Sequence, residues 1–219
     1  LCDPGRLVAL KKMDFTSGLS PPTIVSNQDE FVLQPHSVFN ISCTGKRNVV
    51  WAEPLPDNTF VYPGYYTSTL FIYNASVAHT GYYICKYEIQ EGGPEDEDDS
   101  ETGIYVFVPD PQAPFVPEDP GNLVVPVFTD GAIIPCRVSD PHSHVILRSV
   151  SSGEEVPAPY DNKMGFFSLL SHGQYQCETV VNGQTVTTVT YTVKSLAGPA
   201  FQQQWLHPRK QARYATRTL

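Results

Sequence analysis

The sequence lacks several features that would mark an enzyme or a membrane protein. None of its apolar runs reaches the roughly 18 residues that a transmembrane helix needs, so no segment is expected to cross a bilayer. It contains no Gly-x-Ser-x-Gly nucleophile motif and no glycine-rich phosphate loop followed by Lys and Ser or Thr. We therefore expect no catalytic residues, no cofactor and no enzymatic activity in this chain.

Positively charged residues are few as well. The chain has 14 Lys and Arg against 23 Asp and Glu, which gives a formal net charge of −9. Four of the positive charges lie after residue 196, where no acidic residue occurs: Arg209, Lys210, Arg213 and Arg217. Removing these four charges from the net of −9 leaves −13 for the rest of the chain. A body this acidic disfavours nucleic acids and anionic membranes, and it favours a basic protein partner.

The densest negative charge lies between Glu91 and Glu101 and includes the unbroken run Glu95–Asp99. Blocks of like charge are usually solvated, so we predict an exposed hairpin loop here. A calcium site is disfavoured because the run lacks the spaced oxygen ligands of a calcium-binding loop. His142-Ser143-His144 has a spacing that can bind a metal on a strand, but it follows Pro141 and has no cluster of further ligands. A solvated turn is favoured there, and no metal site is predicted.

Five cysteines are present, and four of them form two matched intervals. Cys43 and Cys85 are 42 residues apart, and Cys136 and Cys177 are 41 residues apart. Each interval ends in Gly-x-Tyr-x-Cys, with Tyr83 and Tyr175 two residues before the second cysteine. This pattern is typical of an immunoglobulin-type sandwich, in which one disulfide joins two sheets and the tyrosine hydroxyl fixes a corner. Two copies predict a tandem repeat of that domain with disulfides Cys43–Cys85 and Cys136–Cys177.

Matched cysteine pairs indicate an oxidising compartment, and two glycosylation sequons agree with it. The sequons are Asn40-Ile41-Ser42 and Asn74-Ala75-Ser76. We therefore expect an extracellular chain with glycans at Asn40 and Asn74. The chain starts at Leu1 and has no apolar leader segment before Phe31, which we interpret as a partial chain and not as a sign of the cytosol. Cys2 has no partner in the pattern. The alternatives are a free thiol, an intermolecular bridge and a non-native end, and the last is favoured.

Short strand-like runs separated by turn residues predict an all-β fold with two sandwich domains, residues 21–110 and 111–194. Residues 1–20 are unassigned, and residues 195–219 are predicted to be a disordered basic tail. Trp51, eight residues after Cys43, is placed to pack on the first disulfide. Five prolines between Pro109 and Gly121 predict a stiff, extended linker between the domains.

The strands expected in the first domain include Thr67–Ile72, Tyr82–Ile89 and Gly103–Val108. Those expected in the second are Leu123–Phe128, Ala132–Val138, Val145–Ser149, Gly165–Leu170, Gln174–Val181 and Gln184–Val193. The second domain has no tryptophan at the place that corresponds to Trp51. Val145 and Leu147 are therefore expected to fill its core beside Cys136–Cys177.

Four sequence blocks are more specific than the cysteine pattern. They are Ala78–Cys85, Tyr105–Pro111, Ala132–Pro141 and Tyr160–Phe166. Their sequences resemble the first two extracellular immunoglobulin domains of platelet-derived growth factor receptors, the class III receptor tyrosine kinases. Vascular endothelial growth factor receptors share a weaker version of the same blocks. The resemblance covers roughly residues 21–194.

This resemblance implies a growth-factor-binding role. Complete receptors of the family carry five immunoglobulin domains, one transmembrane helix and a cytoplasmic kinase. A dimeric, basic cystine-knot growth factor binds mainly to the second and third domains and brings two receptors together. The present chain has no kinase domain and departs from the family plan after Lys194. The resemblance therefore implies a contribution to ligand binding and receptor dimerisation, or action as a soluble decoy.

In this family the ligand-facing patch of the second domain lies on its first and last strands. This implies Leu123 and Val125 on one strand, and Thr192 and Lys194 on the other. The last two depart from the aromatic residues that relatives often have there. For Leu123 and Val125 the alternative is ordinary inward packing. For the whole chain, the alternative is an adhesion or structural immunoglobulin module that binds no growth factor.

Overall fold

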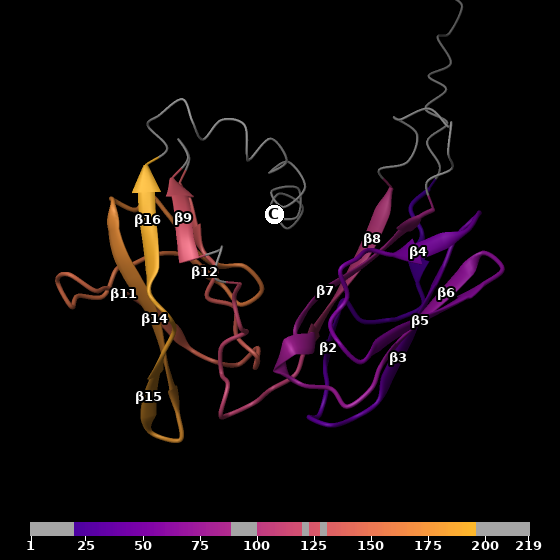
Figure 1. Ribbon diagram of the computed structural model, residues 1–219, viewed down its shortest axis with the longest axis horizontal. Coiled ribbons are helices and arrows are strands. Elements are labelled where there is room, and N and C mark those ends of the chain that lie inside the picture. Colours follow the sequence, from indigo (N-terminus) through magenta and orange to yellow (C-terminus); the bar gives the residue numbers. More distant parts are fainter. Residues whose placement is uncertain (1–19, 89–99, 120–122, 128–130, 196–219) are drawn as a thin grey trace, which may run out of the picture.

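The computed structural model describes residues 20–88, 100–119, 123–127 and 131–195. Within these ranges the regular elements are β-strands and one 3₁₀ turn, and the strands group into two lobes that lie side by side (Figure 1). The all-β class predicted from the sequence is confirmed. Cys2, the acidic run Glu95–Asp99 and residues 196–219 lie outside the described residues.

The first lobe, residues 20–108, packs two four-stranded sheets face to face. One has the order β1 (Thr23–Ile24), β3 (Phe39–Thr44), β6 (Thr67–Ile72) and β5 (Thr59–Gly64). The other has the order β2 (Glu30–Val32), β8 (Glu101–Phe107), β7 (Gly81–Tyr87) and β4 (Val49–Trp51). The 3₁₀ turn η1 (Val77–His79) leads into β7. The predicted last hairpin is thus β7 and β8, and the acidic run connects these two strands in the sequence.

The second lobe, residues 114–195, has the same two-layer plan. Its smaller sheet has the order β10 (Ala132–Ile134), β13 (Gly165–Ser168) and β12 (Tyr160–Asp161). The larger sheet has the order β11 (Val145–Ser149), β14 (Gly173–Val181), β16 (Tyr191–Ser195) and β9 (Val124–Val127), with β15 (Gln184–Thr187) also paired to β14. Strand β9 runs parallel to β16 at the edge of this sheet.

One disulfide joins the two sheets of each lobe. Cys43 of β3 is bonded to Cys85 of β7, and Cys136, which follows β10, is bonded to Cys177 of β14. Trp51 is buried in the same core as the first pair and lies in register with Cys85. In the second lobe Val145 and Leu147 are buried beside the disulfide, where the sequence predicted that they would replace an aromatic ring.

The tyrosine of each Gly-x-Tyr-x-Cys motif fixes a corner in the way the motif predicts. The hydroxyl of Tyr83 donates to the carbonyl oxygen of His79 at 3.0 Å, and the hydroxyl of Tyr175 donates to that of Ser171 at 3.0 Å. Both bonds reach four residues back along the chain. Burial raises the pKa of Tyr83 well above its ordinary value, so this hydroxyl keeps its proton and stays a donor.

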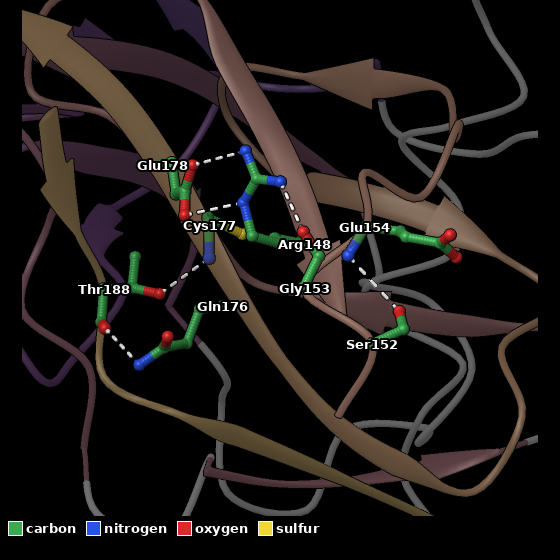
Figure 2. A network of polar contacts seen from close by, with 8 residues as sticks. All are labelled: Arg148, Ser152, Gly153, Glu154, Gln176, Cys177, Glu178 and Thr188. Carbon is green, nitrogen blue, oxygen red and sulfur yellow. Dashed lines mark hydrogen bonds and ion pairs between the residues drawn. The ribbon is translucent and has the colours of Figure 1, made fainter. Parts of the chain in front are cut away.

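The predicted strand Gln184–Val193 is wrong as a single strand, because a β-bulge divides it. Thr187 pairs with Glu178 and Tyr191 pairs with Tyr175, so four steps along one strand oppose three along the other. At the bulge the hydroxyl of Thr188 accepts a hydrogen bond from the backbone N–H of Cys177 at 3.0 Å (Figure 2). A side chain thus takes the place of a ladder carbonyl, and the strand resumes as β16.

The proline-rich segment also differs from the stiff, extended linker that the sequence predicted. Phe115 forms a bridge with Val138, and the N–H of Val116 donates to the carbonyl oxygen of Arg137 at 2.9 Å. Glu118 forms an ion pair with Arg137, with Oε1 and Nη2 2.8 Å apart. Proline removes only its own donor, and the residues between the prolines still pair along an edge. The segment from Pro114 onward therefore belongs to the second lobe, which leaves a shorter connection than the sequence predicted.

Strand β8 contributes side chains to both lobes. Ile104, Val106 and Val108 are buried in the first core, whereas the alternate residues Tyr105 and Phe107 are fully buried in the second core. Alternation along a strand sends successive side chains to opposite faces, and here each face meets a different lobe. The lobes are therefore joined by a shared strand as well as by the connecting segment.

A lysine of the second lobe adds a polar contact at this junction. The Nζ of Lys163 lies 2.8 Å from Glu30 Oε2 on β2. The same Nζ lies 5.5 Å from the ring centroid of Tyr105 on β8. One cation thus meets a carboxylate and an aromatic face of the other lobe, which fixes the lobes at a third point.

Candidate functional site

The candidate site is the outer face of the larger sheet of the second lobe, where β9 lies beside β16. Val124 is in register with Thr192, and Pro126 is in register with Lys194. Residues in register share a face, so Val124 and Thr192 lie next to each other on the outside of the sheet. Val124 is 44% exposed. The two strands that the sequence singled out are therefore brought together by the fold.

On β9 the side chains that face outward are not the two that the sequence predicted. Val125 is only 4% exposed and belongs to the second core, and Leu123 is partly buried against the same core. The expectation that they form an exposed patch is therefore not met, and inward packing applies to both. The residues that sequence reasoning missed are Val124 and Pro126. The apolar run Leu123–Val127 carries no signal of its orientation. The pairing of β9 with β16 supplies it, because Val193, in register with Val125, faces inward.

On the side of the same sheet away from β9, an ion pair joins β11 and β14. Arg148 donates from Nε to Glu178 Oε1 at 2.8 Å and from Nη2 to Glu178 Oε2 at 2.9 Å (Figure 2). Its Nη1 donates to the carbonyl oxygen of Gly153 at 2.7 Å. Hydrogen bonding to Glu178 raises the pKa of Arg148 above its ordinary value, so the guanidinium stays charged. This two-point geometry ties β11 to β14, on the side of the sheet opposite β9.

Neighbouring glutamine and threonine side chains extend this polar surface toward β16. Gln176 donates from Nε2 to the hydroxyl of Thr190 at 3.0 Å. Gln174 of β14 is exposed and lies in register with Thr192. An exposed apolar edge at Val124 is thus flanked by amide and hydroxyl groups, which is the composition of a protein-binding rim more than that of a small-molecule pocket.

The remaining candidate groups lie on the surface. Asn40 and Asn74 are both exposed, and Asn74 Oδ1 lies 2.8 Å from Nδ1 of His36. His142 contacts Asp140 at 3.1 Å. No group of three or more metal-ligating side chains occurs in the described part of the chain. The described residues also include no helix that is long and apolar enough to cross a membrane.

Comparison with known proteins gives a consistent relationship. Residues 20–118 match the family described as "VEGFR1-3, N-terminal Ig-like domain". The chain is 37% identical over 186 residues to platelet-derived growth factor receptor alpha of Mus musculus, which covers 80% of this chain and 17% of the receptor. It is 36% identical over 188 residues to the alpha receptor of Homo sapiens, with 81% and 17% covered. Against the beta receptor of Homo sapiens it is 33% identical over 172 residues, with 76% and 15% covered.

The chain thus spans less than a fifth of the length of these relatives. The matched part is their extracellular immunoglobulin-like region and includes no kinase domain. Two sandwich lobes, each with an inter-sheet disulfide and a tyrosine corner, agree with that region. Over these residues the chain belongs to the platelet-derived growth factor receptor family, as part of its extracellular immunoglobulin-like region.

Proposed function

We propose that this chain is a growth-factor-binding unit whose contact surface is the β9–β16 edge of the second lobe. Its partner is a dimeric, basic cystine-knot growth factor of the platelet-derived type. The observation that carries the proposal is the exposed apolar side chain of Val124, which lies beside Thr192 at a sheet edge of a receptor-family ectodomain. Within a longer receptor the bound dimer brings two chains together; a secreted form holds the ligand as a decoy.

The proposal also assigns the chain's organisation and setting. It has two domains, residues 21–110 and 111–194, and it is exposed outside the cell with glycans at Asn40 and Asn74. Both asparagines are exposed, as a glycan requires, and the two disulfides are of the kind kept in oxidising compartments. The distribution of charge suits a basic ligand, since the chain without its basic tail has a formal net charge of −13.

Calorimetry with the growth factors of this family tests the proposal directly. We expect saturable binding of one growth-factor dimer by two chains, with an affinity below that of a complete receptor ectodomain. The stoichiometry follows from the two equivalent faces of a dimeric ligand. Absence of any heat or saturation with every member would favour the alternative, an adhesion or structural immunoglobulin module, whose partner would be a like-folded surface protein.

Val124→Asp is expected to accelerate dissociation of the growth factor at least tenfold. A charge placed in a desolvated apolar contact has no partner and costs more than about 1.4 kcal/mol, which is a factor of ten. The matched control is Val180→Asp, because Val180 is 66% exposed on the same sheet but lies at the β14–β15 hairpin. Surface plasmon resonance should show an unchanged dissociation rate for this control. Equal effects from both variants would place the contact elsewhere on the sheet.

The acidic run should act on association and not on dissociation. Replacing Glu95–Asp99 by their amides removes charge that attracts a basic ligand at long range. The association rate is expected to fall at low ionic strength, and the difference should shrink at physiological salt, where charges are screened over about 8 Å. Stopped-flow measurements across a salt series give both rates. A much faster dissociation of the amide variant would make the run a contact surface.

A further inference from the structure

The outer sheet of the first lobe carries a cluster of exposed aromatic rings. We call it the aromatic face, and it consists of Phe60 and Tyr62 on β5, Phe71 on β6 and Tyr73 just after β6. Phe60 is 51% exposed and Tyr62 is 54% exposed. The rings touch one another, with centroids 5.1 Å apart for Tyr62 and Phe71 and 5.6 Å apart for Phe60 and Tyr73. This sheet faces away from the second lobe (Figure 1). Exposed aromatic side chains gathered in one contiguous surface indicate an interaction site.

The glycosylation sequon at Asn40 lies on the same sheet face. Asn40 of β3 is in register with Phe71, which is in turn in register with Phe60. Its neighbour Ile41 is buried, so alternation along β3 points Asn40 outward with the rings. On the other side of β3, strand β1 pairs only with Cys43 and Thr44 and provides no aromatic ring beside Asn40.

We propose that the N-linked glycan on Asn40 lies over the aromatic face, with its core N-acetylglucosamine units stacked on Phe71 and Phe60. This inference rests on the proposed glycosylation of Asn40. Neighbouring strands are about 4.8 Å apart, so the first sugar extending across the sheet meets Phe71 and the next meets Phe60. The C–H faces of pyranose rings carry partial positive charge and pack against the negative faces of aromatic rings.

The glycan explains why a surface this apolar can stay exposed in an extracellular protein. Its apolar sugar faces cover the rings, and its hydroxyl groups present a hydrated outer surface. A protein partner docking flat on this sheet would have to displace the glycan, since Asn40 adjoins Phe71 with no strand between them. The aromatic face is therefore assigned to an occupant that belongs to the chain itself.

The test uses the full chain expressed in mammalian cells with Asn74→Gln. Of the two sequons, this leaves the one at Asn40. Glycopeptide mass spectrometry first establishes that Asn40 is occupied. The N-acetyl methyl proton of its first sugar should then resonate upfield of its free-glycan position, because it lies over an aromatic ring. Asn40→Gln should lower the melting temperature by about 4 °C, the shift expected for a contact of about 1 kcal/mol in a domain of this size.

A double-mutant design separates stacking from other effects of the glycan. In a Phe60→Ser/Phe71→Ser background, Asn40→Gln is expected to leave the melting temperature unchanged. A Tyr65→Ser background is the control for loss of an exposed aromatic ring, because Tyr65 is 81% exposed and lies at the β5–β6 turn, outside the aromatic face. In that background Asn40→Gln should still lower the melting temperature. Asn40→Gln is preferable to a Ser42 variant, since Ser42 Oγ lies 2.8 Å from Thr69 Oγ1.

Two results would overturn the inference, and they are distinguishable. An occupied Asn40 with unshifted N-acetyl signals, and with the same thermal effect in both backgrounds, would leave glycosylation intact but remove the stacking. An unoccupied Asn40 would remove the proposed glycosylation and the stacking together, and would leave the aromatic face free for a protein partner. The spectroscopic measurement needs no substitution of the rings, so it holds even if the double variant fails to fold.

Discussion

Gly165→Ala is expected to unfold the second lobe. Gly165 begins β13 with φ +102°, and a Cβ atom there would lie 2.0 Å from the carbonyl oxygen of Ile134 and 2.6 Å from the amide nitrogen of Cys136. Both are backbone atoms of the adjacent segment that leads into the disulfide, so neither can move away cheaply. We expect a loss of more than about 4 kcal/mol in the free energy of unfolding, which is the range of exceptional substitutions.

Gly153→Ala is the matched control for this variant. Gly153 also has a positive φ of +71°, but an added Cβ would meet no atom within 4 Å. It should cost only the about 1–2 kcal/mol of a left-handed conformation. Urea denaturation followed by tryptophan and tyrosine fluorescence compares the two variants. If Gly165→Ala unfolded at nearly the same urea concentration as the parent chain, the close approach of β13 to residues 134–136 would be disproved.

Val125→Asp is expected to destabilise the chain severely, whereas Val124→Asp, one residue away, is expected to be tolerated. Val125 is buried in the second core beside Val193 and Cys136, where a carboxylate would be unpaired. Leaving a charge uncompensated in a core costs about 3–5 kcal/mol. Val124 faces outward, and surface substitutions usually stay within about 0.5 kcal/mol.

Thermal denaturation and the yield of secreted protein measure this contrast. A folded Val125→Asp variant with an unchanged melting temperature would mean that β9 presents its other face to the core. The contrast also matters for binding experiments. Loss of growth-factor binding in Val125→Asp would report unfolding, so only Val124→Asp tests the contact surface.

The sequence alone predicted the structure correctly where a short motif determines the local geometry. In this motif the Tyr two residues before the Cys hydrogen-bonds back to the chain at a corner, and the two copies predicted both corners and both cysteine pairs. The same motifs, with Trp51 and the alternating Val145 and Leu147, predicted the centres of both cores. These are residues whose neighbours are set by covalent bonds and by strand alternation.

The candidate face could not be oriented from the sequence, because Leu123–Val127 is apolar throughout. A strand without alternation gives no information on which residues face inward, and an error of one position exchanges the two faces. The parity of β9 is set instead by its pairing with β16. The bulge at Thr188 also shifts β16 by one residue along β14, which the single strand predicted over Gln184–Val193 did not include.

Two other differences between prediction and structure fall on segments that contain proline. Strand β5 contains Pro63 and was not predicted, yet it is at the edge of its sheet, where a missing donor costs little. The segment around Phe115 was predicted to be a stiff, extended linker because of its prolines, yet it pairs with Val138. The aromatic face escaped notice as a consequence, since half of it lies on β5.

Strand β8 makes the connection between the lobes mechanical as well as covalent. A fragment cut after residue 108 would present Tyr105 and Phe107 to water, and the second lobe alone would lack part of its core wall. Neither half can therefore be removed without cost to the other. Tension applied to the second lobe passes directly into β8, whose other face is packed in the first core, so the two lobes turn together.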